Sequence, residues 1–175
     1  LTMTMLTFML LYGPIITCFP VLADGKFVAN SAMIGLAMIF SSLGTAAVAS
    51  RLGSISRRFS SAAILFSSQG LYVAALLLLP FVPDLHWALL PLFLYGMGQG
   101  LNIPTVQSLL LQTAPTELRA SIMAVNGMLL RLGQSLAPVS FSAVAMSLGI
   151  SWGFYAGIIL AGLLALLVML FLPRK

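Results

Sequence analysis

Ten of the eleven charged residues of this chain lie between six long apolar stretches, and this pattern limits its possible folds more than any other feature. Of the 175 residues, eight are basic, three are acidic and 61% are hydrophobic. A soluble domain needs far more charge on its surface. Each stretch approaches or exceeds the ~20 apolar residues that cross a ~30 Å hydrocarbon core as a helix. The sequence therefore predicts an all-α membrane protein.

We expect a single bundle of six transmembrane helices over residues 1–175, because the connections are too short to form a soluble domain. Backbone polar groups inside a bilayer must find partners within their own segment, so each apolar stretch is a predicted helix. The predicted spans cover residues 2–22, 31–50, 61–81, 88–111, 120–148 and 152–172.

The basic residues gather on one side of the membrane if the six helices are threaded in order. Lys26 is the only basic loop residue on the other side, which also carries Asp24, Asp84 and His86. The excess on the basic side predicts that both termini are cytoplasmic, and it explains the net charge of +5 without nucleic-acid binding. The residues on the basic side are Arg51, Arg57, Arg58, Arg119, Arg174 and Lys175.

The start of the chain lacks the features of a signal peptide, since it has neither a basic leading region nor a small-residue cleavage site. It begins at Leu1 without an initiator methionine. We therefore expect an N-terminal part to precede it.

The fourth and fifth predicted spans carry most of the polar side chains. Tyr95, Gln99 and Asn102 are spaced i, i+4, i+7, so they share one helix face. The fifth span adds Asn126 and, further on, Gln134. Polar groups at this depth are costly in lipid, so we expect them to face the bundle or a wet cavity. Two interpretations stay open: contact with a substrate, or hydrogen bonds between helices worth only ~0.6 kcal/mol on average.

Arg131 is the most informative single residue. It lies 12 residues after Arg119, which is about 18 Å along a helix and close to the middle of the membrane. A charge there costs at least ~2.5 to 3.5 kcal/mol on insertion scales, so it needs a partner or water. One hypothesis is an anchor for an anionic substrate or a carboxylate. The alternative is a guanidinium that bonds to carbonyl groups or extends towards the cytoplasm.

No carboxylate of this chain lies deep enough to pair with Arg131, because Asp24, Asp84 and Glu117 are all in loops or at helix ends. If transport is coupled to protons, the carboxylate must come from the preceding part. Glu117 follows Pro115 and Thr116, a pattern that predicts the start of the fifth helix with Thr116 as its cap. We also expect Glu117 and Arg119 to pair with the loop arginines at a cytoplasmic gate.

Glycine and proline interrupt the same two spans. Gly96 and Gly100 form a GxxxG pair that lets another helix approach closely, and Pro104 predicts a bend. Gly133 and Pro138 are expected to act similarly in the fifth span. Tight packing alone explains such glycines, whereas bends beside polar residues are also how rocking transporters build gates.

Enzymatic function is disfavoured. The segment from Gly133 to Ala137 is close to G-x-S-x-G, but the only histidine, His86, lies in a loop on the side opposite the cytoplasm. With one histidine, one cysteine (Cys18) and no cluster of carboxylates, the sequence supplies no metal site, and we expect no cofactor.

Three segments resemble the tenth and eleventh helices of the major facilitator superfamily, most closely its bacterial drug-efflux members. The segments are Tyr95 to Gly100 with Pro104, Ala114 to Arg119, and Arg131 to Pro138. The loop from Ser50 to Arg58 is similar to a degraded copy of the D-R-x-G-R-R signature of that family, with Ser50 in place of the acidic residue.

The resemblance implies that the chain is the C-terminal six-helix half of a twelve-helix fold, whose partner is an N-terminal half. It also implies that the first, second, fourth and fifth spans line a central cavity. The expected function is alternating-access transport of a small solute, by proton-coupled efflux, in the bacterial cytoplasmic membrane. The alternative is a self-contained six-helix channel or a membrane assembly partner. Candidate substrate contacts are Tyr95, Gln99, Asn102, Asn126, Arg131 and Gln134.

Overall fold

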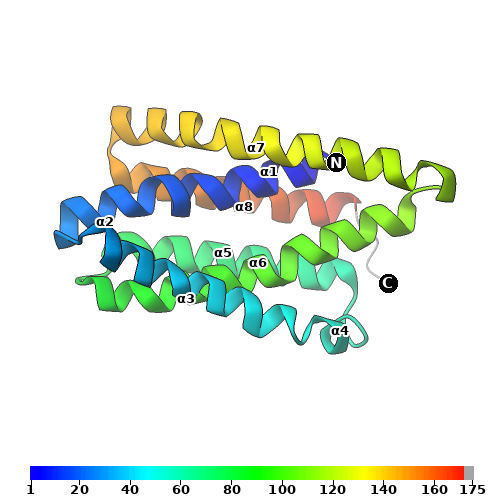
Figure 1. Cartoon of the computed structure of the whole chain (residues 1–175), viewed down its shortest axis with the longest axis horizontal. Helices are drawn as coiled ribbons and strands as arrows, with labels where there is room; N and C mark the ends of the chain where they lie inside the picture. The colour runs from blue at the N-terminus through cyan, green and yellow to red at the C-terminus, as the bar shows by residue number, and fades with distance from the viewer. Residues whose placement is uncertain (172–175) are drawn as a thin grey trace.

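The protein is all-helical over residues 1–171, the part of the chain that the structure, a computed structural model, describes. Six long helical segments alternate in direction, as Figure 1 shows. The first consists of α1 (Thr2–Leu11), the π-helix η1 (Tyr12–Cys18) and α2 (Phe19–Phe27). The others are α3 (Ser31–Ala49), α5 (Ser61–Leu78) with the 3₁₀ turn η2 (Leu79–Phe81), α6 (Leu85–Thr113), α7 (Arg119–Leu148) and α8 (Ile150–Phe171).

Two short elements connect these segments at the same end of the bundle. The turn α4 (Leu52–Ile55) follows α3, and the 3₁₀ turn η3 (Thr116–Leu118) precedes α7. Polar side chains start two of the long helices: Asn30 Oδ1 accepts from Met33 N at 2.9 Å, and Ser60 Oγ accepts from Ala63 N at 3.3 Å.

Four of the six segments are long and apolar enough to cross a membrane. These are Thr2–Phe27, Ser31–Ala49, Ser61–Phe81 and Ile150–Phe171. α6 and α7 are longer, at 29 and 30 residues, but they carry most of the polar side chains, which lowers their hydropathy. Crossing of the membrane by α6 and α7 therefore stays a prediction.

Several predicted boundaries differ from the helices of the structure. The first helical segment continues five residues past Leu22 to Phe27, because Lys26 Nζ donates to the carbonyls of Pro80 and Val82 at 2.9 and 2.8 Å. Val28 then ends it in the left-handed conformation, with φ of 51°. Thr116 is not the cap that we predicted: Leu118 is the N-cap residue of α7, and no side chain caps it. The C-terminal end of the predicted sixth span lies outside the described residues.

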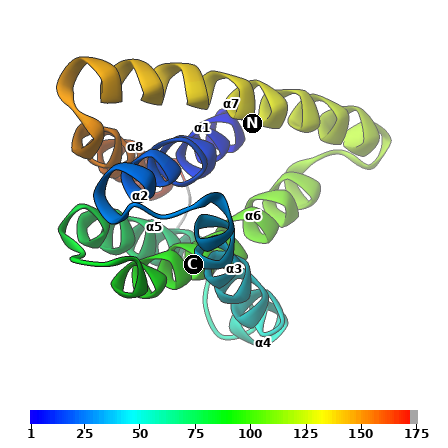
Figure 2. The same ribbon diagram turned by 60° about the vertical axis from the view of Figure 1, so that its left-hand side comes forward.

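The six segments pack as two related groups of three. α3 and α5 pack on α6, and α7 and α8 pack on the rod formed by α1 and η1. If the first three segments are exchanged in order with the last three, the contact of α3 with α6 corresponds to the contact of α7 with α1. In the same way, the contact of α5 with α6 corresponds to the contact of α8 with α1, and α5 and α8 contact each other. Figure 2 shows the consequence: α7 lies over α1 and α8, on the far side of the bundle from α3 and α6.

The core lies among α1, η1, α5, α6 and α8. Its largest fully buried side chains include Tyr72, Tyr95, Phe19 and Phe154. Cys18 is also buried there, and its side chain would meet a Cβ placed on Gly153.

Candidate transport site

The polar side chains of α6 are mostly engaged by neighbouring helices. Tyr95 is fully buried, and its hydroxyl donates to the carbonyl of Leu10 in α1. Pro14 has no amide hydrogen, so it cannot give that carbonyl the usual helical bond from four residues later. Asn102 is fully buried as well, and its Nδ2 donates to Ser68 Oγ of α5 at 3.0 Å. Both side chains therefore link helices within the bundle.

Gln99 is only half-buried. Thr45 Oγ1 of α3 lies 3.4 Å from its Oε1, but the same hydroxyl lies closer, at 3.0 Å, to the carbonyls of Ser41 and Gly96. Gln99 is thus the least buried of the three polar residues predicted on this face of α6, and its contact with Thr45 is long.

The glycines of α6 bring α3 into direct contact with α6. A Cβ on Gly96 would collide with the carbonyl of Ser41, and one on Gly100 would lie 2.6 Å from the carbonyl of Thr45. In return, a Cβ on Gly44 of α3 would collide with the carbonyl of Phe93. Backbone touches backbone here, and the helix of α6 continues through Pro104.

α7 uses its polar residues differently. Asn126 is buried, and its Oδ1 accepts from Thr4 Oγ1 of α1 at 2.7 Å. Gly133 faces the same way, since a Cβ there would collide with the carbonyl of Met5. Gln134 and Pro138 are half-buried, and Arg131 is exposed.

The exposed surface of α7 has two distinct faces. Ala124, Met128, Arg131 and Ser135 recur at intervals of four, three and four residues, so they share one exposed face, which we call the arginine face. Beside it lies a purely apolar face, in which Val139 is 70% exposed. The apolar face suits lipid, whereas the arginine face suits water or a polar partner. The apolar face consists of Val125, Leu132, Leu136 and Val139.

Arg131 is the thirteenth of the 30 residues of α7, near the middle of the helix. The acidic residues lie far from it along the bundle: Asp24 is in the last turns of α2, Asp84 precedes α6, and Glu117 is in η3. Arg131 therefore lies near the middle of α7, away from the bundle ends that carry the acidic residues of the described chain.

The charged residues predicted for the cytoplasmic gate share one end of the bundle. Arg51, Arg57 and Arg58 are exposed around α4, and Glu117 and Arg119 are exposed at the start of α7. Arg119 Nε donates to the carbonyl of Ala114 at 3.4 Å. The opposite end carries Asp24, Lys26, Asp84 and His86, as predicted (Figure 1). Arg174 and Lys175 lie outside the described residues.

Family comparison identifies the chain. The family model of the Major Facilitator Superfamily matches residues 1–175. The chain belongs to the Major Facilitator Superfamily. A search of curated proteins found no match. Membership of this superfamily, together with the apolar helices, makes the chain an integral membrane protein whose family transports small solutes across membranes.

Buried polar side chains also lie in α5, outside the two polar spans, and sequence reasoning did not single out Tyr72. Gln69 and Tyr72 are almost fully buried, and neither amide atom of Gln69 nor the hydroxyl of Tyr72 has a hydrogen-bond partner within residues 1–171. The ring of Tyr72 packs against Tyr95 at a centroid distance of 4.9 Å. The π-helix η1 was also not predicted, although Pro14 in the middle of an apolar stretch was a usable signal.

Proposed function

We propose that this chain is the C-terminal six-helix half of a twelve-helix transporter that moves a small, partly apolar solute by alternating access. All six long helical segments, α6 and α7 included, then cross the membrane. The observation that carries the proposal is the exposed Arg131 on the arginine face of α7, because a charge near the middle of a membrane-crossing helix is costly against lipid. A second half that covers this face leaves a wet cavity between the two, which is where such transporters bind solute.

We assign the substrate contacts to Arg131, Gln134 and Gln99, whose side chains are exposed or half-buried. Contacts from Tyr95, Asn102 and Asn126 stay predictions. Hydrogen bonds within the bundle already occupy groups of these three side chains, which supports a role for them in holding the helices together.

The proposed mode is efflux coupled to protons. Arg131 lies at mid-depth, and the acidic residues of the described chain lie at the ends of the bundle. The titrating carboxylate is therefore supplied by the N-terminal half, where it faces Arg131 across the cavity. The resemblance to bacterial drug-efflux members supports a drug or metabolite as the solute and the bacterial cytoplasmic membrane as the location.

The orientation follows from the charge at the two ends of the bundle. We propose that the end with the four described arginines is cytoplasmic, because basic loops stay on that side. Cysteine labelling of intact cells, on a Cys18→Ser background, checks it: a cysteine at Asp84 is labelled from outside and one at Ser54 is not. The reverse pattern contradicts the orientation.

Reconstitution tests the function. The full twelve-helix transporter in proteoliposomes is expected to move a small, partly apolar fluorescent solute against its gradient when a pH gradient is imposed, whereas residues 1–175 alone insert without transport. Transport by the 175 residues alone would support the alternative of a self-contained channel. Transport by the full protein that ignores the pH gradient would remove proton coupling and leave the rest of the proposal standing.

A further inference from the structure

A polar pocket opens at the basic end of the bundle, between α4, α5 and α6. Its volume is about 440 Å³, which is enough for a phosphate ester headgroup. Hydroxyl and amide side chains supply much of its lining, and Leu52, Phe59 and Ile64 supply apolar edges. The polar side chains are Ser56, Ser60, Ser61, Thr105, Ser108 and Gln112.

Three arginines lie beside lining residues of this pocket in the sequence, although none of the three lines it. Arg51 precedes α4, and Arg57 and Arg58 occupy the turn between the lining residues Ser56 and Phe59. All three are exposed, and this end of the bundle also carries Arg119 and one acidic residue, Glu117. Four arginines against one carboxylate give the described part of this end a net positive charge. Arg58 is followed directly by Phe59, which is 58% exposed and so presents an apolar ring beside the charge.

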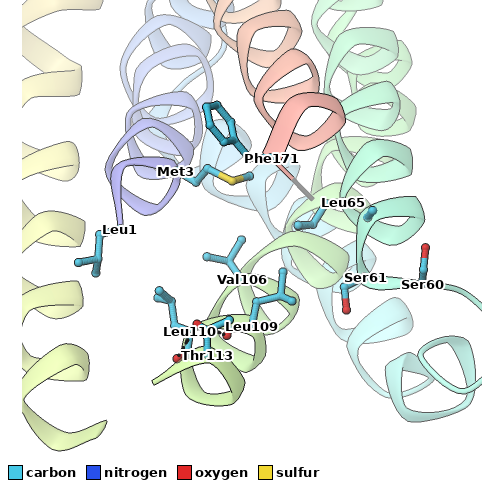
Figure 3. A pocket seen from close by; sticks show the side chains of 11 residues that line it. Leu1, Met3, Ser60, Ser61, Leu65, Val106, Leu109, Leu110, Thr113 and Phe171 are labelled. Atoms are coloured by element: carbon cyan, nitrogen blue, oxygen red, sulfur yellow. Dashed lines mark hydrogen bonds between the residues drawn. The ribbon is translucent and has the colours of Figure 1, made fainter. Parts of the chain in front are cut away.

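A second pocket, which is apolar, lies on the other side of the start of α5 (Figure 3). Its volume is about 580 Å³. Ser60 and Ser61 line both pockets, so the polar and the apolar pocket meet at these two residues. In Figure 3, side chains from α1, α5, α6 and α8 surround the apolar pocket, including Met3, Leu65, Val106, Leu109 and Phe171.

We propose that these two pockets together bind one anionic phospholipid. Its phosphate headgroup occupies the polar pocket under the arginines, and an acyl chain passes Ser60 and Ser61 into the apolar pocket. An amphiphile suits a polar and an apolar pocket that share one edge, and the arginines at this end favour a negative headgroup. The proposal needs only that this end of the bundle lies at a lipid headgroup layer, so it is independent of the solute and of the direction of transport.

Native mass spectrometry of the detergent-solubilised protein tests this site. Titration with dioleoyl phosphatidylglycerol and with dioleoyl phosphatidylcholine compares two headgroups on the same acyl chains. We expect one phosphatidylglycerol to bind at least about tenfold more tightly than phosphatidylcholine. Glycerol 3-phosphate and inorganic phosphate are expected not to displace it at millimolar concentration. Displacement by either would assign the polar pocket to a free phosphate compound and overturn the lipid proposal.

Charge and shape are tested by separate variants. Arg58→Gln is expected to weaken phosphatidylglycerol about fivefold, the equivalent of ~1 kcal/mol for one basic residue at an anionic surface, and Arg58→Lys to keep most of the affinity. Ser108→Phe fills the polar pocket without changing charge, so it is expected to abolish the preference for phosphatidylglycerol. Its matched control is Ser147→Phe, an exposed serine near the opposite end of the bundle, which should leave binding unchanged.

Two results contradict the proposal. If Ser108→Phe binds phosphatidylglycerol as the unmodified protein does, the arginines attract lipid only as a charged surface and the pocket is not a site. If phosphatidylcholine binds as tightly as phosphatidylglycerol, the headgroup charge is irrelevant. Circular dichroism of each variant confirms its helical fold before the lipid titration.

Discussion

Polar residues of α6 and α7 show two different uses of polarity, although Asn126 of α7 is buried and bonded to α1 like the buried residues of α6. In α6, Tyr95 and Asn102 are fully buried and bond to α1 and α5. In α7, Arg131 is exposed near the middle of the helix, beside an apolar face that suits lipid. Polar side chains at membrane depth can therefore serve two purposes, and the burial of each side chain distinguishes them. Buried polar groups join helices, whereas exposed polar groups need a solute, water or a second half of the transporter.

The glycines repeat this difference. Gly96 of α6 brings its backbone against the carbonyl of Ser41, whereas a Cβ on Gly127 of α7 would meet nothing within 4 Å. Gly133 of α7 resembles Gly96, since a Cβ there would collide with the carbonyl of Met5, so the contrast is between these two close contacts and the open position at Gly127.

The largest expected effect comes from substituting these two glycines. Gly96→Ala forces α3 and α6 apart and is expected to destabilise the protein by about 3 kcal/mol, the upper range for overpacking a close contact. Gly127→Ala is expected to stabilise it by about 0.5–1 kcal/mol, because alanine costs less backbone entropy than glycine in a helix. Thermal unfolding in detergent, followed by size-exclusion chromatography, measures both. Equal effects would break the distinction between the two positions.

A smaller effect is expected for Tyr95→Phe, which keeps the buried ring and removes only the hydroxyl. The carbonyl of Leu10 then loses a donor that Pro14 cannot replace, and the expected loss is about 1 kcal/mol. Transport by each folded molecule should not change if the hydroxyl serves only to join α6 to α1. A change in transport with unaltered stability would return Tyr95 to the substrate site, as the sequence alone suggested.

The helical class and the charge at the two ends of the bundle could be predicted because they depend on the length of the apolar stretches and on where the charged residues lie between them. Apolar length and the placement of charge between the stretches gave the antiparallel order, and the structure has Arg51, Arg57, Arg58 and Arg119 at one end. The end of the first segment could not be predicted in this way, since Lys26 extends the helix by bonding to carbonyls some 55 residues away, at Pro80 and Val82.

The division of polar residues was also beyond the sequence. The spacing of Tyr95, Gln99 and Asn102 correctly places them near one another on α6, but it cannot say whether a neighbouring helix or a cavity lies opposite. That depends on partners such as Ser68 and Thr45, which lie 34 to 54 residues away. Burial of Tyr72 likewise depends on packing between helices, so the sequence alone did not single it out.

The most direct test of the account is transport by Arg131→Leu in the full transporter, compared with Ser68→Ala. The first removes an exposed polar group at mid-depth, and the second removes a buried one that accepts from Asn102. We expect Arg131→Leu to reach the membrane at near-normal levels and to lose at least about tenfold in transport rate per molecule, or ~1.4 kcal/mol. Arg131→Lys should lose most of the rate as well, because an ammonium lacks the planar fork of the guanidinium. Ser68→Ala should lose stability and keep its rate per folded molecule. Normal transport by Arg131→Leu would contradict the account, and the site would then have to be sought at Gln99 and Asn102.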